Sequence, residues 1–333
     1  MRDVLPTLRR WTEDEKRFAL ATVTSTWGSS PRAVGSVMGV CEDGGTCGSV
    51  SGGCIESAVI DEALRALESE EPRRLHFGQV SDEKAWEVGL SCGGEINVWV
   101  DPAPSERDPG LWSSLITRLE KEEPCVLATR YEPLRQVLWT PGSPCEDAPA
   151  EVVLAIQEAY SNRRSTEVEG WFLNVLPCRD RLVIIGAVHI ARALVPLARE
   201  VGFETVVVDP RKAFATEEAF GAGPDRIVDK WPEEALSEIE LTEDTYAVVL
   251  THDPKIDDAA LAVLLRSDVA YIGALGSRTT QAKKRKELSA KGFSDEELDR
   301  IHGPVGLSIG ARTPEEIALS IMAEIVQVKR GRG

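Results

Sequence analysis

The stretch Leu182-Val-Ile-Ile-Gly-Ala-Val-His-Ile-Ala191 decides the fold of the second half of the chain. Its first four residues are continuously apolar, as in a strand that is covered on both faces of a sheet. Gly186 then allows a tight turn. Leu194, Leu197 and Ala198 follow at the spacing of one helix face. The stretch therefore predicts a strand, a turn and a helix, in the order that begins a doubly wound fold.

Further apolar runs repeat this alternation of strand and helix towards the end of the chain. We expect strands at Glu204–Val208, Arg226–Val228, Tyr246–Leu250 and Val269–Ile272. Thr313-Pro-Glu-Glu316 has the capping threonine, proline and glutamate that begin a helix, and we expect that last helix to fray at its Lys-Arg-Gly-Arg-Gly tail. The alternation predicts a parallel sheet with helices on both faces.

The first half has a different pattern, with short strands and fewer helices. Its expected helices begin near Leu5, Ile55, Leu111 and Ala150. Its expected strands include Phe18–Thr26, a hairpin that leads from Met38 to Val50, Arg73–Phe77, Glu95–Val100, Cys125–Arg130, Gln136–Trp139 and Glu167–Cys178. Pro177 suggests a hinge. The predicted fold class is α/β, with a mixed α/β domain at 1–177 and a Rossmann-like, doubly wound parallel sheet at 178–333.

Composition and charge exclude several classes of partner. The chain has 333 residues, 38 basic and 55 acidic, and a formal net charge of -17. Such a surface repels nucleic acid and anionic membranes, so we expect neither as a partner. No apolar run reaches membrane-spanning length, and the start is too short and polar for a signal peptide, so we expect a cytoplasmic protein.

The seven cysteines do not form a recognisable framework. Their number is odd, and no pair has the C-x-x-C spacing, which argues against structural disulfides and a structural zinc site. The four histidines include no H-x-x-x-H pair. A site for a soft metal would therefore need cysteines in settings that favour the thiolate.

Two glycine-rich loops provide such settings. Gly48-Ser-Val-Ser-Gly-Gly-Cys-Ile-Glu56 places Cys54 where we expect a helix to open, and free N–H groups at a helix start favour a thiolate and a bound anion. Ser91-Cys-Gly-Gly94 is a second loop of this type. We predict that Cys54 and Cys92 lie near each other at one solvent-accessible site. The alternative is a pair of plain turns with small packed cysteines.

Candidate anion ligands also occur in other loops. Arg32 lies in a loop of turn-forming residues, Arg278 follows two glycines and a serine, and Arg312 ends the glycine-rich segment that begins at Gly303. An arginine that precedes a helix start is well placed to bind an anion. Each of these residues has the alternative of an ordinary surface arginine.

The expected carboxyl ends of the parallel strands carry the remaining candidates. Ligands of doubly wound sheets bind where these ends open a crevice. The dinucleotide pattern is incomplete, because Val188 replaces its second glycine, although Asp209 lies where a ribose-binding acid is usual. A scaffold without nucleotide is the alternative. The candidates at these ends are one glycine and seven polar or charged residues, namely Gly186, His189, Asp209, Arg211, His252, Asp253, Ser277 and Arg278.

Together these motifs resemble the XdhC/CoxI family of accessory proteins for molybdenum hydroxylases. The matching stretches run in order along nearly the whole chain and are Ala19–Gly35, Gly48–Glu56, Leu90–Gly94, Ile184–Ala191, Val207–Arg211, Thr251–Pro254, Tyr271–Arg278 and Gly303–Glu316. The family usually has glycine where this chain has Val188, which puts nucleotide binding by that loop in doubt.

The resemblance implies a chaperone that binds the molybdenum cofactor (molybdopterin), protects it while a cysteine desulfurase adds its terminal sulfur, and inserts it into apo-xanthine dehydrogenase or a related enzyme. It implies that Cys54 and Cys92 contact the cofactor or its metal, with Arg32, Ser51, Gly52, Gly53, Gly93 and the carboxyl-end residues as further contacts. The oligomeric state is open, and a homodimer is one expectation.

Three hypotheses follow. The first is a cofactor chaperone without turnover of its own, and the second is an NAD(P)-dependent oxidoreductase that uses Gly186–Ala191 and Asp209. The third is an assembly factor that binds the client enzyme and no ligand. Val188 counts against the second, so we expect weak NAD(P) binding or none.

Overall fold

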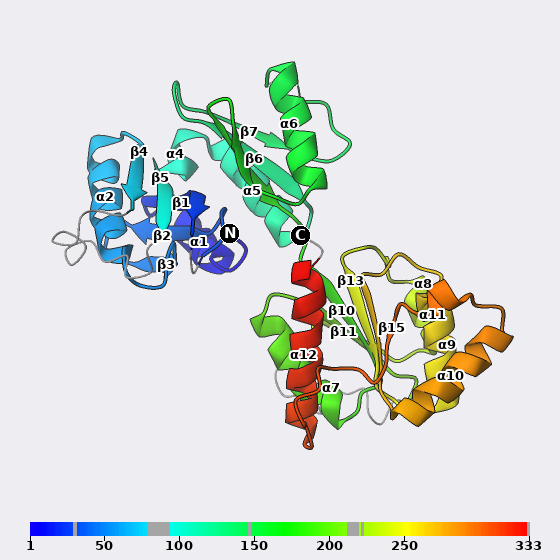
Figure 1. Ribbon diagram of the computed structural model, residues 1–333. Coiled ribbons are helices and arrows are strands. Elements are labelled where there is room, and N and C mark those ends of the chain that lie inside the picture. The colour runs from blue at the N-terminus through cyan, green and yellow to red at the C-terminus, as the bar shows by residue number, and fades with distance from the viewer. Residues whose placement is uncertain (29–31, 79–93, 146–147, 212–219, 221–222, 332–333) are drawn as a thin grey trace. The chain divides into compact units, whose positions relative to one another are not determined.

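A computed structural model of the chain divides into two compact units, Met1–Cys178 and Arg179–Gly333 (Figure 1). It describes every residue except 29–31, 79–93, 146–147, 212–219, 221–222 and 332–333. Each unit has its own sheets and its own hydrophobic cores. No helix among the described residues is long and apolar enough to cross a membrane.

The first unit contains two antiparallel sheets. The five-stranded sheet has the order β3-β2-β1-β5-β4, with β1 at Phe18–Trp27, β2 at Val37–Cys41, β3 at Thr46–Gly48, β4 at Arg73–Phe77 and β5 at Glu95–Pro102. The four-stranded sheet has the order β7-β6-β9-β8, with β6 at Cys125–Arg130, β7 at Arg135–Trp139, β8 at Thr166–Val168 and β9 at Trp171–Leu176. The helices among the described residues of this unit are α1 (Leu5–Glu13), α2 (Glu56–Ser69), α4 (Pro104–Arg107), α5 (Pro109–Glu120) and α6 (Ala150–Ser161).

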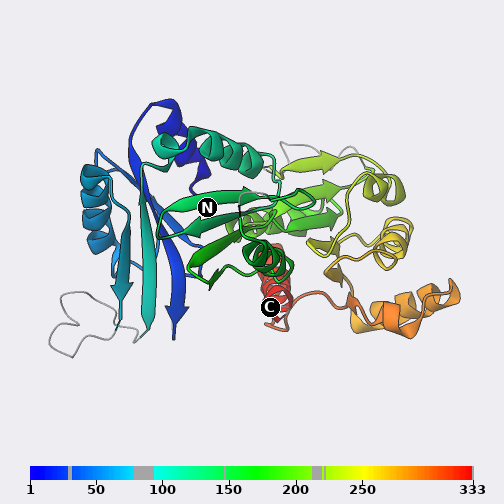
Figure 2. The same cartoon turned by 90° about the horizontal axis from the view of Figure 1, so that it is seen from above.

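Alternating apolar residues give the sheets of the first unit their cores. Helix α2 lies along one face of the five-stranded sheet, as Figure 2 shows, with Val59 and Ala63 against Val98. Helices α1 and α5 fill the other face, where Leu8 and Leu115 share a core with residues of both sheets. Helix α6 covers the remaining face of the four-stranded sheet. The Gly48–Glu56 segment connects the end of β3 to the start of α2.

The second unit contains one parallel sheet with the order β12-β11-β10-β13-β14-β15. Its strands are β10 (Arg181–Ile185), β11 (Glu204–Val208), β12 (Arg226–Val228), β13 (Thr245–Val249), β14 (Tyr271–Ala274) and β15 (Ile301–His302). Its helices are α7 (His189–Glu200), α8 (Pro232–Ser237), α9 (Pro254–Leu264), α10 (Arg278–Ala290), α11 (Asp295–Leu298) and α12 (Pro314–Gly331). Numbered by chain order within the unit, the strand order is 3-2-1-4-5-6, which is the Rossmann order.

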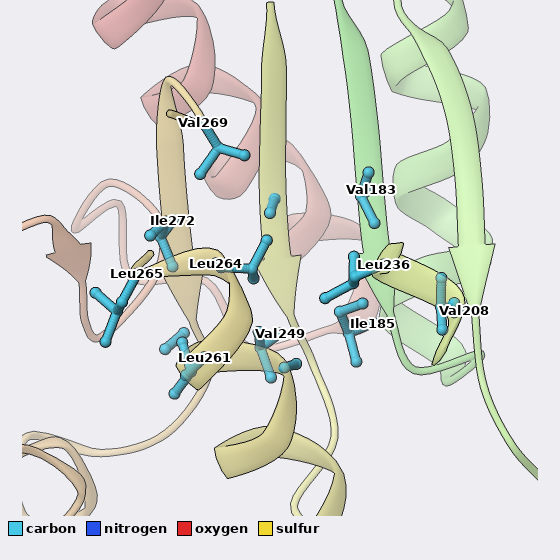
Figure 3. Close-up of a cluster of buried hydrophobic side chains, with 14 of the residues drawn as sticks. Val183, Ile185, Val208, Leu236, Val249, Leu261, Leu264, Leu265, Val269 and Ile272 are labelled. Atoms are coloured by element: carbon cyan, nitrogen blue, oxygen red, sulfur yellow. The ribbon is translucent and has the colours of Figure 1, made fainter. Parts of the chain in front are cut away.

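Two cores sandwich this parallel sheet. Val183 and Ile185 of β10 face α8 and α9 in the core of Figure 3, whereas Leu182 and Ile184 face α7 and α12. Both faces are buried, which explains the continuously apolar strand sequence. The doubly wound parallel sheet predicted from the sequence is therefore confirmed.

Three local predictions were wrong. The segment Glu167–Cys178 forms two strands, because Glu169 and Gly170 adopt positive φ angles of 49° and 80° and turn the chain. Helix α2 begins at Glu56 with Ile55 as its N-cap, so Cys54 precedes the helix and does not open it. Helix α12 continues to Gly331, because Lys329 pairs with Asp180 and lies 4.8 Å from the centre of the Phe203 ring.

Candidate functional site

The loops of the first unit that contain the candidate residues adjoin one edge of the five-stranded sheet, where its strands begin or end. At this edge β1 ends at Trp27, β2 begins at Val37 and β3 ends at Gly48, because these neighbouring strands are antiparallel. The start of β5 at Glu95 pairs with Trp27 and lies at the same edge. Loops that join strands commonly carry binding residues, because the sheet holds these loops in place.

Ser51 organises the loop that contains Cys54. Its side chain is buried, and its Oγ accepts the N–H groups of Gly53 and Cys54 at 3.1 Å and 3.2 Å and that of Ile55 at 3.5 Å. Ser51 Oγ donates to Glu56 Oε2 at 2.6 Å. The N–H groups expected to hold an anion are therefore directed at a side chain of the protein itself.

Glu56 is the acceptor at the centre of this network. Its Oε1 accepts from Ser49 Oγ at 2.7 Å and from the Ser51 N–H at 2.9 Å. Burial alone would raise the pKa of the Glu56 carboxyl, but the hydrogen bonds from Ser51 and Ser49 outweigh burial and lower this pKa. A charged, half-buried carboxylate thus holds the loop at neutral pH.

Cys54 differs from the other described cysteines in its exposure. Its side chain is exposed beside the exposed Gly52 and Gly53, whereas Cys41 and Cys125 are buried and the other three described cysteines are partly buried. Burial raises the pKa of Cys125 to about 11, and burial also raises the pKa of Cys41. A reagent or ligand in solvent therefore reaches Cys54 before those two thiols.

The other candidates of the first unit are only partly placed. Arg32 is exposed in the loop between β1 and β2. The nearby Gly35 has a φ of +89°, and a Cβ there would lie 2.9 Å from Asn174 Oδ1 of β9, so glycine is required for this loop to pack. Cys92 and Gly93 lie outside the described residues. The predicted proximity of Cys54 and Cys92 therefore stays a prediction.

The carboxyl ends of β10, β11, β13, β14 and β15 define one edge of the second unit, here called the carboxyl edge. Gly186 follows β10 with a φ of +108°, and a Cβ there would lie 2.5 Å from Thr251 Cγ2, beyond the end of β13. Val188 has φ -90° and ψ 173°, which any residue can adopt, and it packs partly against the α7 core. Only the first position of the turn thus needs glycine.

Asp209 is engaged within the protein and not directed at solvent. It is fully buried after β11, and its two carboxylate oxygens accept from the Ala187 N–H at 2.8 Å and from Arg211 Nε and Nη2 at 2.9 Å and 2.7 Å. Burial would raise the pKa of Asp209, but the Arg211 side chain and the Ala187 N–H hold this pKa below its usual value. An acid held in this way is poorly placed to bind a ribose hydroxyl.

The other carboxyl-edge candidates lie at helix starts. His189 is the exposed first residue of α7. Asp253 caps α9 by accepting from the Lys255 N–H at 3.0 Å, and His252 beside it is exposed. Ser277 caps α10 by accepting from the Thr280 N–H at 3.2 Å, and Arg278 is exposed at the first position of that helix. Asp253 and Ser277 thus have structural partners of their own.

Helix α12 places Arg312 on the side of the carboxyl edge. The C-terminal end of α12 lies near the start of β10, because Lys329 pairs with Asp180. The helix therefore begins towards the opposite end of the sheet, where Thr313 and Glu316 form the predicted capping box. The exposed Arg312 precedes that start.

A buried ion pair at the carboxyl edge was not predicted from the sequence. Lys284 of α10 pairs with Asp257 of α9, and Asp257 also accepts the hydroxyl proton of Thr251. All three are at least nine-tenths buried. Burial raises the pKa of Asp257 despite the opposing effects of Lys284 and Thr251. No local spacing signals this pair, because its members are 27 residues apart and on different helices.

Among the described residues, no group of three or more histidine, cysteine and acidic side chains forms a metal site. The two units thus define an α/β protein in which a Rossmann sheet follows a unit with an exposed cysteine loop. Residues 182–325 match the family model of the XdhC Rossmann domain, and residues 11–78 match the model of the XdhC and CoxI family.

Named relatives agree with these matches. The chain is 31% identical over 315 residues to the molybdenum cofactor insertion chaperone PaoD of Escherichia coli, covering 94% of this chain and 84% of that protein. It is 28% identical over 323 residues to a protein of Bacillus subtilis named as a probable xanthine dehydrogenase subunit, covering 96% of this chain and 95% of that protein. The chain belongs to the XdhC and CoxI family.

A solved structure supports the same fold. A crystal structure titled as a xanthine dehydrogenase from Bacillus halodurans has a TM-score of 0.80 and 27% identity, and the match covers 99% of this chain and 96% of that one. The uncharacterized protein YqeB of Escherichia coli is 28% identical over 312 residues, and the chain spans only 43% of its length.

Proposed function

We propose that this chain is a chaperone that binds the molybdenum cofactor and inserts it into an apo-xanthine dehydrogenase or a related molybdenum hydroxylase. Its similarity to a relative named as a molybdenum cofactor insertion chaperone supports the proposal over nearly the whole chain. The names of the Bacillus relatives support a client of the xanthine dehydrogenase type. The chaperone has no turnover of its own.

The exposed thiol of Cys54 is the observation that carries the proposal. Molybdopterin contains a phosphate and a dithiolene, and soft metals favour thiolate ligands. Cys54 presents sulfur to solvent on a loop that its own hydrogen bonds hold in place. With Cys92, this residue is our candidate contact for the metal end of the cofactor.

The second unit contributes positive charge under this proposal. Arg278 and Arg312 are exposed at the starts of α10 and α12, where their guanidinium groups can reach an anion in solvent. Arg32, His189 and His252 remain proposed contacts. We also propose that the bound cofactor receives its terminal sulfur from a cysteine desulfurase, and that the chaperone acts as a homodimer.

Dinucleotide binding is the competing function. Two observations count against it: Val188 stands in the phosphate turn, and Asp209 is held by Arg211 and the Ala187 N–H. We therefore expect no NAD(P) binding at micromolar concentration. Calorimetry with NAD(P) measures this directly, and micromolar affinity would favour the oxidoreductase hypothesis.

Equilibrium dialysis against molybdopterin tests the proposed function. The wild type should bind, Cys54→Ala should bind at least about tenfold more weakly, which is about 1.4 kcal/mol, and Cys47→Ala should serve as the matched control because Cys47 is partly buried. The same variants should then be compared in activating an apo-xanthine dehydrogenase. The proposal fails if the wild type binds no molybdopterin and activates no client.

A further inference from the structure

The Ser51 hydroxyl lies where a bound anion would lie in an open helix-start loop. Its Oγ is 3.1 Å from the Gly53 nitrogen and 3.2 Å from the Cys54 nitrogen, and Ser51 is only 3% exposed. The N–H groups therefore point inward to Ser51. A ligand that approaches from solvent meets the thiol of Cys54 and the two exposed glycines instead.

Glu56 fixes the direction in which the Ser51 hydroxyl donates. A carboxylate can only accept, so the Ser51 proton goes to Glu56 Oε2 and the lone pairs of Oγ remain free for backbone N–H groups. A glutamine could not reproduce this. Its amide nitrogen would face either the Ser51 hydroxyl, which would then reverse, or the Ser51 N–H, donor against donor.

The charges within the loop and the first turns of α2 also disfavour a phosphate. From Gly48 to Leu64 the sequence contains no lysine or arginine, and it contains three acidic residues, Glu56, Asp61 and Glu62. Phosphate sites at helix starts use free N–H groups together with cations, whereas this loop directs the N–H groups of residues 53–55 at Ser51 and contributes no cation from its own sequence.

We infer that Ser51 and Glu56 are positioning residues that hold Cys54 in place, and that this loop takes the soft, sulfur- or metal-bearing end of the cofactor and not its phosphate. The inference rests on the proposed function. It changes the role of Ser51, which the sequence suggested as a direct contact. The phosphate must then be bound by other parts of the protein.

The test compares Glu56→Gln with Glu62→Gln in the full chain. Glu62 is the matched control because it is a partly buried carboxylate on the same helix, bonded to Arg65 and Arg73 and not to the loop. Amide hydrogen exchange at residues 53 and 54 and alkylation of Cys54 with and without molybdopterin are the measurements. Glu56→Gln should lose about tenfold in amide protection and about tenfold in molybdopterin affinity. Glu62→Gln should change neither, and millimolar inorganic phosphate should leave Cys54 alkylation unchanged.

Ser51→Ala provides a second variant that removes the acceptor without adding volume, and it should show the same losses. If Cys54→Ala loses molybdopterin binding while the Ser51 and Glu56 variants retain both affinity and amide protection, this inference alone is overturned. Protection of Cys54 by inorganic phosphate would also overturn it. If Cys54→Ala binds as tightly as the wild type, the proposed cofactor contact and this inference fall together.

Discussion

The Cys54 loop of the first unit and the carboxyl edge of the second unit are held by carboxylates in different ways. Glu56 is partly buried and accepts from hydroxyl and N–H donors that are neutral. Asp257 is buried and paired with the charged Lys284. Breaking a buried ion pair leaves a charge without a partner, which costs far more than the loss of a neutral hydrogen bond. We therefore expect Asp257 to matter mainly for the stability of the second unit, and Glu56 to matter mainly for the position of Cys54 in the first.

Lys284→Met gives the largest expected effect. It should lower the free energy of unfolding of the second unit by about 3–5 kcal/mol, because Asp257 is left buried and uncompensated. Urea denaturation followed by hydrogen exchange in residues 179–333 measures this. Lys291→Met is the control, since Lys291 is half exposed and pairs with Asp258 at 3.3 Å, and it should change stability by less than about 1 kcal/mol. Equal effects of the two variants would show that burial of the Lys284–Asp257 pair adds nothing to stability, which would remove its contrast with the Cys54 loop.

Gly186→Ala should have the next largest effect. A Cβ at this residue would lie 2.5 Å from Thr251 Cγ2 at a φ of +108°, so we expect a loss of about 2–4 kcal/mol from strain and overpacking. Gly202→Ala is matched, with a φ of +89° and open space around the new methyl, and should cost only about 1–2 kcal/mol. Thermal denaturation distinguishes them, and a smaller loss for Gly186→Ala would contradict the tight packing of this edge.

Asp209→Asn should show a pH-dependent effect. The folded pKa of Asp209 is lowered, so its contribution to stability is complete above the pKa of an unfolded aspartate and is lost as the pH falls through the folded pKa. We expect the variant to be less stable than the wild type by about 1.5–3 kcal/mol at neutral pH. This difference should shrink below about pH 4. Urea denaturation at several pH values measures this difference in stability. If the difference between variant and wild type grew on acidification, it would contradict a stabilising Asp209–Arg211 pair.

Arg278→Gln and Arg312→Gln should have the smallest effects on folding. Both side chains are exposed, so each substitution should change the free energy of unfolding by less than about 0.5 kcal/mol. Each should weaken molybdopterin binding by about tenfold, as expected for the loss of one charged contact. Equilibrium dialysis and urea denaturation give the two quantities. Normal binding by both variants would confine the ligand site to the first unit.

Much of the second unit could be predicted from the sequence because its strands are buried on both faces. The runs at 182–185, 206–208 and 247–249 are apolar throughout, and the structure places strands there. The short β15 escaped notice because Ile301–His302 is too brief to show a pattern. The turn at Gly170 was not predicted because the sequences of β8 and β9, read together, resemble one long strand.

The candidate site, like the fold, could be predicted only in part from the sequence. The sequence by itself identified the candidate loops, because glycine pairs, cysteine and arginine are local signals that can be recognised without knowing their neighbours in the fold. Only the tertiary structure showed that Ser51 takes up the N–H groups near Cys54, that Asp209 is held by Arg211 and the Ala187 N–H, and that Asp257 pairs with Lys284. The physical reason is that the direction of a hydrogen bond and the burial of a charge depend on three-dimensional neighbours, which the spacing of residues along the chain does not specify.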